Sequence, residues 1–188
     1  GPKAVPGKYK VQLTLNGEVQ EQEFEILKDP RVPSTQADFQ KQFDFLKEIS
    51  DKLTETHEAI ISIRSIKKDL AAWKAKTASD STMKEIGEMA DGLSKQLTAV
   101  EKTLYQTKNR SGQDPLNFPI RLNNKLAHIA SLTNMGDYPP TDAAITVKTE
   151  MVKAIDAELA KYKKVVSEEI PKFNALVKEK GVEAVKVE

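Results

Sequence analysis

Two long stretches of this sequence contain neither glycine nor proline, and they constrain the fold more than any other feature. They run from Ser34 to Ile86 and from Thr141 to Ile170, and both are rich in Lys, Glu, Ala, Leu and Gln. Because these residue types favour helix and no breaker interrupts them, both stretches predict long helices. The eight glycines and nine prolines mark the turns between the predicted elements.

The spacing of apolar residues divides the chain into four amphipathic helices. From Phe39 to Trp73 the apolar residues recur every three or four positions if Thr56 fills one gap. This spacing is close to the roughly 3.5-residue repeat of supercoiled bundles. A second stripe follows the same rule from Ile86 to Leu104.

Capping residues and prolines predict where each helix begins and ends. The first helix is predicted to start at Ser34 or Thr35, and the second to run from Ser79–Ser81 to about Lys108. The third is predicted to begin at Asn117 and to end at Gly136, and the fourth to be capped by Thr141 or Asp142. Pro171 predicts a kink near Glu168–Ile170 because proline has no N–H to donate, and Gly181 is placed to cap the C-terminal end.

The first 33 residues follow a different, two-residue period. Apolar and polar residues alternate from Lys8 to Leu15, and Asn16-Gly17 then predicts a type I′ hairpin turn. The second strand is predicted from about Glu18 to Leu27, with Phe24 and Ile26 on one face. The five-residue spacing between Val19 and Phe24 means that either Val19 faces the other way or a bulge separates them.

The predicted fold is therefore mainly α, an up-down-up-down four-helix bundle preceded by a short N-terminal β-hairpin. Residues 1–31 form the hairpin, as the remnant of a β-sandwich, with its linker, and residues 32–188 form the bundle. A two-stranded hairpin is at best marginally stable alone, so its apolar face must rest on the helices or on strands from elsewhere.

Composition excludes several functional classes. With 29 basic and 28 acidic residues the net charge is +1, which argues against a nucleic-acid binder. The absence of cysteine removes thiolate metal sites and nucleophiles, and neither His57 nor His128 completes a Glu-x-x-His motif. No metal or cofactor is expected, and His57 is expected to be partly buried. No apolar run is long enough to span a membrane, and no signal peptide is evident.

The most unusual segment is the polar loop from Asn109 to Asn124. One hypothesis makes it an interaction loop, formed by Asn109, Asp114, Asn117, Asn123 and Asn124. The other makes it a structural turn, in which Asn117 caps the third helix while Leu116 and Phe118 pack against the end of the bundle. We favour the turn, since every residue type there suits a turn or a cap. Carboxylates elsewhere alternate with lysines at helical spacing, which predicts solvent-exposed ion pairs rather than a catalytic pair.

Two segments together resemble a known family. The run from Pro6-Gly7-Lys8-Tyr9 through Asn16-Gly17 to Asp29-Pro30-Arg31 resembles the ending of an immunoglobulin-like sandwich. The stretch from Asp114-Pro115-Leu116-Asn117 to Asn124-Lys125-Leu126 looks like the C-terminal helical region of exported bacterial sortilin-like proteins with BNR-repeat β-propellers, often labelled glycosyl hydrolases. In that family any catalytic residues are expected on the propeller, so none maps onto this chain.

The resemblance implies a non-catalytic accessory module at the C-terminal end of a larger exported protein. Its partners would be the preceding domains of that protein, and its location would be periplasmic or extracellular. An alternative is a bundle that binds a protein or a carbohydrate through an exposed groove. A third reading is an enzyme in its own right, or a part of a glycoside hydrolase that contributes to its activity. The sequence offers no recognisable reactive cluster for either.

Overall fold

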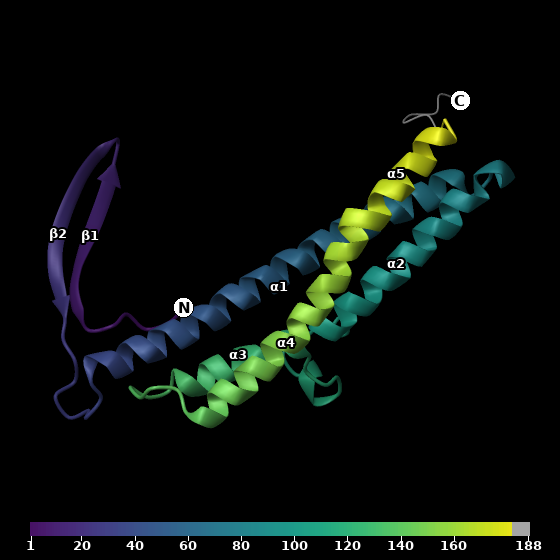
Figure 1. The fold of residues 1–188 in the computed structure, drawn as a ribbon. Coiled ribbons are helices and arrows are strands. Elements are labelled where there is room, and N and C mark those ends of the chain that lie inside the picture. The colour runs from purple at the N-terminus through teal and green to yellow at the C-terminus, as the bar shows by residue number, and fades with distance from the viewer. Residues whose placement is uncertain (182–188) are drawn as a thin grey trace. The chain divides into compact units, whose positions relative to one another are not determined.

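The computed structural model describes residues 1–181 and is mainly helical. A two-stranded antiparallel β-hairpin comes first and four helices follow, as predicted (Figure 1). The strands are β1 (Gly7–Leu15) and β2 (Glu18–Ile26). The helices are α1 (Gln36–Thr77), α2 (Lys84–Leu104), α3 (Leu122–Thr133) and α4 (Asp142–Lys164), the last continuing through a π-helical segment (Val165–Glu169) into α5 (Ile170–Glu179).

The chain divides into two compact units that share helices. Unit 1 comprises Gly1–Leu53 and Leu126–Glu150, and unit 2 comprises Thr54–Lys125 and Met151–Glu188. Helices α1, α3 and α4 each contribute a segment to both units, so the predicted boundary after residue 31 falls inside unit 1.

The hairpin forms at the predicted place and in a regular register. Asn16 (φ 52°) and Gly17 (φ 87°) both adopt positive φ, which confirms the type I′ turn. Tyr9 pairs with Phe24 and Thr14 with Val19, and the pairing is continuous from one end to the other. No bulge restores the parity of Val19, so this side chain lies on the face opposite Phe24.

Helix α1 starts at the predicted cap. The Thr35 backbone N–H and hydroxyl both donate to the carboxylate of Asp38, at 2.9 and 2.7 Å, and the Asp38 N–H donates back to the Thr35 hydroxyl at 3.3 Å. This reciprocal capping box satisfies backbone donors that the first turn leaves without partners. Thr56 is fully buried in the apolar stripe of α1, as the sequence predicted.

The predicted apolar stripe of α2 is buried throughout, from Ile86 to Leu104. Helix α2 begins after a short 3-10 turn (Ser81–Met83), whose start is capped by the side chain of Asp80. It ends at Leu104, earlier than the predicted Lys108, because Tyr105 adopts an extended conformation.

Helix α3 differs most from its prediction. It begins at Leu122, whereas the sequence predicted a start at Asn117. Asn117 instead follows a short 3-10 turn (Asp114–Leu116), to which its backbone N–H is bonded. Because Pro119 disfavours helix at the residue before it, the chain stays irregular until Arg121. The predicted helix cap at Asn117 was therefore wrong.

The fourth helix breaks where Pro171 predicted. A π-helical segment (Val165–Glu169) precedes α5, and the Ile170 N–H donates to the Val165 carbonyl. Thr141 caps α4 by accepting the Ala144 N–H at 3.1 Å, and Gly181, with φ of 61°, follows the end of α5. All three predicted features of this helix are confirmed.

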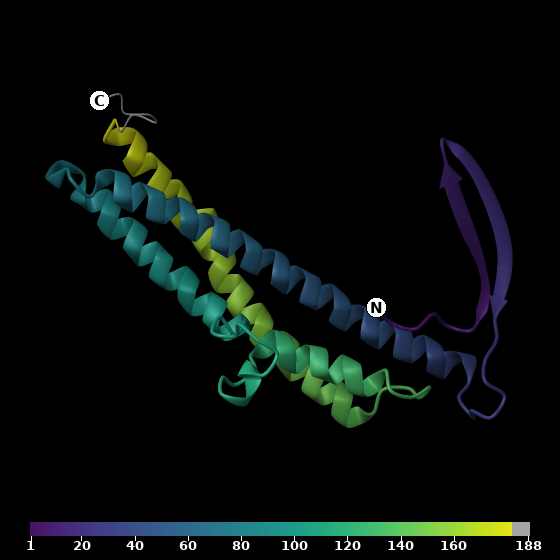
Figure 2. The same cartoon turned by 180° about the vertical axis from the view of Figure 1, so that it is seen from behind.

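Within unit 2, the helices run in directions that the contacts define. Lys74 of α1 pairs with Asp91 of α2 at 2.7 Å, and Arg64 pairs with Glu101 at 2.7 Å, so α2 is antiparallel to α1. The start of α3 then contacts α1 further back, at His57, so the loop 105–121 continues the course of α2 instead of reversing it. Figure 2 shows α2 alongside the second half of α1.

In the same unit, the end of α4 and α5 run parallel to α1. Tyr162 of α4 donates to Ser62 of α1 at 2.8 Å, and Lys180, just beyond α5, pairs with Glu85 at the start of α2. The core of this unit is formed by aliphatic and aromatic side chains from all of these helices: Ile60, Ile63, Leu70, Ile86, Leu93, Leu97, Val100, Leu104, Ile155, Leu159, Val165 and Phe173.

Candidate interaction surface

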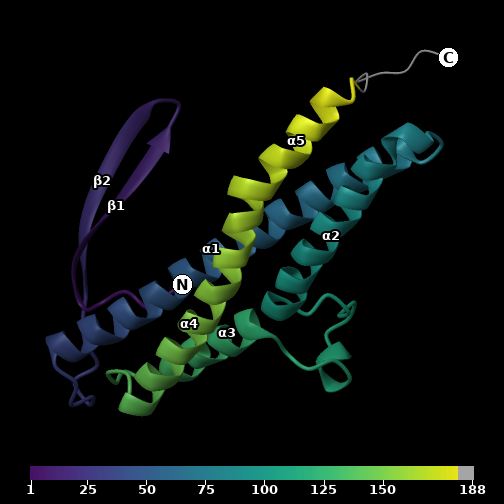
Figure 3. The ribbon, with the colours of Figure 1, turned by 45° about the vertical axis from the view of Figure 1, so that its right-hand side comes forward.

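The hairpin is an amphipathic ribbon whose apolar face is largely uncovered. One face carries Tyr9, Val11, Leu13 and Leu15 from β1 and Phe24 from β2. Val11, Leu13 and Leu15 are 54%, 62% and 67% exposed. Figure 3 shows the two strands reaching away from the start of α1, to which β2 is connected. Contiguous exposed apolar surface of this kind makes the hairpin a candidate interaction surface.

The opposite face of the ribbon is charged and internally paired. Lys8 lies across from Glu25 and Lys10 from Glu23, and the Lys10 ammonium bonds to the Glu21 carboxylate at 2.8 Å. Cross-strand pairs of opposite charge stabilise an antiparallel ribbon. The hairpin is thus polar on one side and apolar on the other, the pattern of a sheet that is solvated on one face only.

The base of the hairpin is held by a tyrosine. The Tyr9 hydroxyl donates to the Val5 carbonyl at 2.6 Å, four residues upstream, and its ring stacks on Phe24 with centroids 5.9 Å apart. In immunoglobulin-like sandwiches, a tyrosine near the start of a strand also bonds back to the upstream backbone, an arrangement called a tyrosine corner. The alternation from Lys8 to Leu15 places Tyr9 on the apolar face, but spacing alone does not reveal this bond.

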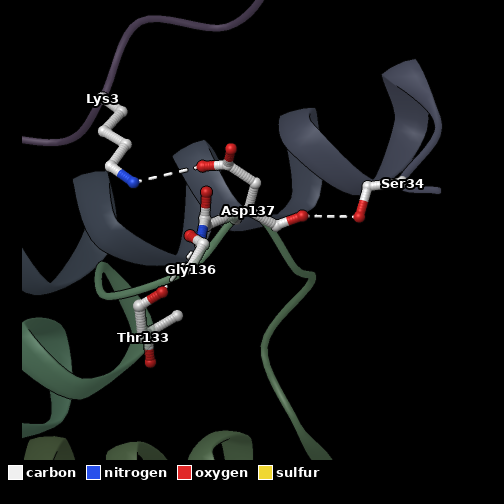
Figure 4. Close-up of polar contacts among 6 residues, drawn as sticks. Lys3, Ser34, Thr133, Gly136 and Asp137 are labelled. Carbon is white, nitrogen blue, oxygen red and sulfur yellow. Dashed lines mark hydrogen bonds and ion pairs between the residues drawn. The ribbon is translucent and has the colours of Figure 1, made fainter. Parts of the chain in front are cut away.

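A cluster of polar contacts attaches the segment around the hairpin to the α3–α4 connection (Figure 4). The Ser34 hydroxyl donates to the Asp137 carbonyl at 2.5 Å, and the Lys3 ammonium pairs with the Asp137 carboxylate at 3.1 Å. The buried Gln42 amide donates to the carbonyls of Thr133 and Gly136, each at 2.8 Å. We call Lys3, Ser34, Gln42 and Asp137 the polar clasp.

Two further bonds join the same region. The Lys28 ammonium, which follows β2, donates to the Ser34 carbonyl at 2.8 Å, and the Gln36 amide donates to the Pro6 carbonyl at 2.8 Å. Ser34 and Gln42 are both buried, so the bonds that these two residues make are shielded from water, whereas the Lys3–Asp137 and Gln36–Pro6 contacts are exposed. The segments on both sides of the hairpin are therefore attached to the start of α1 and to the α3–α4 connection, while the outer part of the hairpin stays exposed.

The structure does not bring the five predicted loop residues into one cluster. Asp114 organises the turn, because its carboxylate accepts the N–H groups of Arg110 and Ser111 and the Ser111 hydroxyl. Its pKa is lowered by these bonds, first of all by the Arg110 N–H. Asn117 closes the 3-10 turn, and Asn124 is exposed.

The remaining two loop candidates are Asn109 and Asn123. Their amide oxygens are buried and accept no hydrogen bond from the described residues. The Asn123 amide nitrogen lies 3.3 Å from Nε2 of His57. His57 itself is exposed, so its predicted partial burial was wrong; it lies beside the buried stripe of α1 rather than in it. Leu116, predicted to pack against the end of the bundle, is 83% exposed.

An ion-pair network around Glu101 was not foreseen from the sequence. Glu101 is 4% exposed, and its carboxylate bonds to Arg64 at 2.7 Å and to Lys67 at 2.9 Å. Burial raises the pKa of Glu101, but the bonds and charges of Arg64 and Lys67 outweigh it, so the pKa lies below its ordinary value. Arg64 also lies over the Tyr105 ring, 5.1 Å from its centroid. This network joins α1 to α2.

The carboxylates that the sequence assigned to ion pairs are paired with lysines. Asp91 bonds to Lys74, Glu88 to Lys84 at 3.5 Å, and Glu169 to Lys172 at 2.8 Å. Among residues 1–181, no three acidic or histidine side chains are grouped so as to hold a metal ion. Within the same range, no helix has the length and apolar content needed to cross a membrane.

Comparison with family models, with curated proteins and with solved structures found no match for this chain.

Proposed function

We propose that this chain is a non-catalytic accessory module that docks onto a β-structured domain through its hairpin. The domain would belong to the same longer, exported protein, of the sortilin-like BNR-propeller kind that the sequence resembles. The hairpin would complete or abut a β-sandwich, and the helices would brace it. The polar clasp would fix the direction in which the hairpin leaves the helices.

The observation that carries this proposal is the exposed apolar face of an otherwise well-anchored hairpin. Val11, Leu13 and Leu15 lie in one row, and no helix of unit 1 covers them. Each buried aliphatic side chain contributes roughly 1.5–3 kcal/mol, so covering this row would stabilise the docked state substantially. The tyrosine corner at Tyr9 supports a β-sandwich as the structure that covers the face.

Substitutions on the two faces of the ribbon test the proposal. The triple variant Val11→Thr, Leu13→Thr, Leu15→Thr removes apolar area and places β-branched residues, which favour strands, at all three positions. Val19→Thr is the control on the opposite face. In the present chain neither variant is expected to shift the helical melting temperature. In the longer protein, the triple variant is expected to lower the melting temperature and to speed hydrogen exchange in the hairpin, while the control does neither.

Two results would overturn the proposal. One is hairpin exchange that is equally fast in the present chain and in the longer protein, because a docked hairpin must be protected. The other is a lower helical melting temperature of the triple variant in the present chain, because the row would then be packed on the helices.

A second candidate function, binding of a protein or a glycan by the bundle, is favoured by a groove in unit 1. The groove, about 420 Å³, lies between α3 and α4 and is lined mainly by apolar side chains, among them Leu132, Tyr138, Pro139 and Val147. Tyr138 is exposed and offers a ring for stacking. If the groove binds glycans, Tyr138→Ala abolishes retention of the chain on a glycan array, while Met135→Ala leaves retention unchanged.

A further inference from the structure

The two free edges of the hairpin differ in what they offer to an incoming strand. A two-residue turn is closed by a hydrogen-bonded pair, here Leu15 and Glu18, and hydrogen-bonded pairs then alternate with open pairs along the ladder. The backbone groups of the open pairs point outward. They belong to Lys8, Lys10, Gln12 and Thr14 on β1, and to Val19, Glu21, Glu23 and Glu25 on β2.

The charges along the two edges are opposite. The outward-pointing residues of β1 include two lysines and no acid, whereas those of β2 include three glutamates and no base. An added strand places its side chains directly beside these residues on the charged face. The edge of β1 therefore suits a strand with acidic residues at alternate positions. The row of glutamates on β2 resists strand addition by charge, as edge strands of native sheets do.

The apolar face also favours β1 over β2 as the strand that receives a further neighbour. On this face β1 is apolar from Tyr9 to Leu15, while β2 carries Glu18, Gln20 and Gln22 before reaching Phe24. A strand inside a sheet is covered more completely than a strand at its edge. The more apolar strand, β1, is therefore suited to the interior position and β2 to the edge.

The tyrosine corner is a third, independent indication. In immunoglobulin-like sandwiches, the strand that begins with this tyrosine lies between two neighbours in its sheet. Tyr9 begins β1, and β2 is already one neighbour. The second neighbour would then lie along the outer edge of β1.

We propose that the outer edge of β1 is the docking site for one antiparallel β-strand that carries apolar and acidic residues in alternation. Its apolar residues extend the row of Val11 and Leu13, and its acidic residues lie beside Lys8 and Lys10. This inference rests on the proposed function, since it names the edge through which the hairpin joins the β-structured domain. A second copy of this chain supplies a poorer match. Its β1 would repeat the lysines, and its β2 has acidic residues at alternate positions but places Gln20 and Gln22 on the apolar face.

Matched proline substitutions on directly opposed residues test which edge is used. Gln12 and Glu21 face each other, and the N–H of each points outward, so proline removes an edge donor without breaking a backbone bond of the ladder. Either substitution removes the side-chain bond between Gln12 and Glu21, and Glu21→Pro also removes the Lys10–Glu21 ion pair. The probes are two capped nine-residue peptides, one alternating Val and Glu and the other alternating Val and Lys. Binding is followed by backbone amide NMR shifts of the present chain, and the Tyr9–Phe24 ring contact reports that each variant keeps its hairpin.

The expected result is that the Val/Glu peptide shifts the amides of Lys8, Lys10, Gln12 and Thr14 and slows their exchange. Gln12→Pro is expected to weaken this binding by about tenfold or more, because a strand hydrogen bond and its neighbours are lost, whereas Glu21→Pro leaves it within about twofold. The Val/Lys peptide is expected to leave the β1 edge unaffected.

The inference is overturned if the Val/Glu peptide protects the outward amides of β2, if Glu21→Pro is the more damaging variant, or if neither peptide binds. It is also overturned if the chain dimerises through β1, since the occupant is then a second copy. In the longer protein, hairpin protection along β2 alone would refute this inference and leave the proposed function standing. A hairpin without any protection there would refute the proposed function itself.

Discussion

Glu101 is the only charged residue that is buried among residues 1–181. Two cationic side chains compensate the charge of its carboxylate. Arg64 and Lys67 both bond to its carboxylate, and neither is fully buried. A buried carboxylate is stabilising only while its partners satisfy it, because an isolated buried charge carries a large desolvation cost. The contact between α1 and α2 is therefore sensitive to protonation at this single residue.

The substitution Glu101→Gln is expected to lower the free energy of unfolding by about 1–2 kcal/mol at neutral pH. Because the pKa of Glu101 is lowered in the folded state, its contribution is complete above the unfolded pKa, about 4.3, and is lost as pH falls through the folded pKa. The difference between wild type and variant should therefore shrink at about pH 3. Urea unfolding of the wild type and the variant, at neutral pH and at about pH 3, measures this difference in the free energy of unfolding.

Glu48→Gln provides the control, since Glu48 pairs with Lys148 but is itself largely exposed. Its effect is expected to stay within about 0.5 kcal/mol at neutral pH. A loss of stability for Glu101→Gln that is the same at both pH values would show that packing, rather than the ion pairs, explains the effect.

Gln42 is the second residue on which local structure depends. It is 3% exposed, and its amide bonds to two carbonyls at the end of α3. Gln42→Ala is expected to cost about 1–3 kcal/mol, because both carbonyls lose their donor in a buried setting. Hydrogen exchange of the α3–α4 connection should also accelerate.

Gln40→Ala is the matched control on the same helix. Gln40 is exposed, and its side chain bonds to that of Asp44, also exposed, at 2.8 Å, so its loss should change stability by less than about 0.5 kcal/mol. If exchange at Gly136 and Asp137 were unchanged in Gln42→Ala, the polar clasp would not be what holds this connection.

At the scale of the element, the π-helical segment before Pro171 shows how one residue changes the register of a helix. Proline has no N–H, so the carbonyl four residues earlier lacks its usual partner. The Ile170 N–H donates to the Val165 carbonyl, five residues away, and α5 then resumes with Pro171 in its first turn, where proline is tolerated.

Pro171→Ala is expected to restore a continuous α-helix and to raise the free energy of unfolding by about 1 kcal/mol, since alanine favours a helix interior far more than proline. Chemical denaturation measures the stability, and NMR amide shifts report whether Ile170 returns to an i to i−4 bond. A stable variant that keeps the π-helical segment would show that neighbouring packing, rather than the proline, imposes it.

At the scale of the whole molecule, the helices supply nearly all of the buried side chains, while the hairpin supplies a surface. The buried apolar residues come from the helices and the π-helical segment, and the strands contribute only half-buried residues near the hairpin base, such as Tyr9 and Ile26. The helices should therefore fold without the hairpin.

Deleting residues 1–31 is expected to leave helicity per remaining residue unchanged. The melting temperature should fall by a few degrees, because the contacts of Lys3, Pro6 and Lys28 with the rest of unit 1 are lost. Circular dichroism and a thermal melt measure both quantities. As a control, replacing only the outer strands, residues 10–23, by a short Gly-Asn turn should cause no fall. Collapse of the helical signal after the deletion would show that the hairpin belongs to the folding core.

The sequence by itself determined the elements, because their causes are local. The alternation before Asn16-Gly17, the Thr35 cap, the α2 stripe and the Pro171 break each depend on neighbouring residues, and each appears where predicted. Local rules also misplaced the start of α3, because Asn117 suits a turn as well as a helix cap, and only the conformation around Pro119 decides between them.

Only the tertiary structure decided which residues that are distant in the sequence become neighbours. The burial of Glu101, the exposure of His57 and the clasp between Ser34 and Asp137 depend on residues distant in the sequence, and no spacing rule encodes them. The candidate interaction surface shows the same division. Alternation predicted an apolar face on the hairpin. The fold leaves that face exposed because the buried apolar side chains of unit 1 all come from its helices.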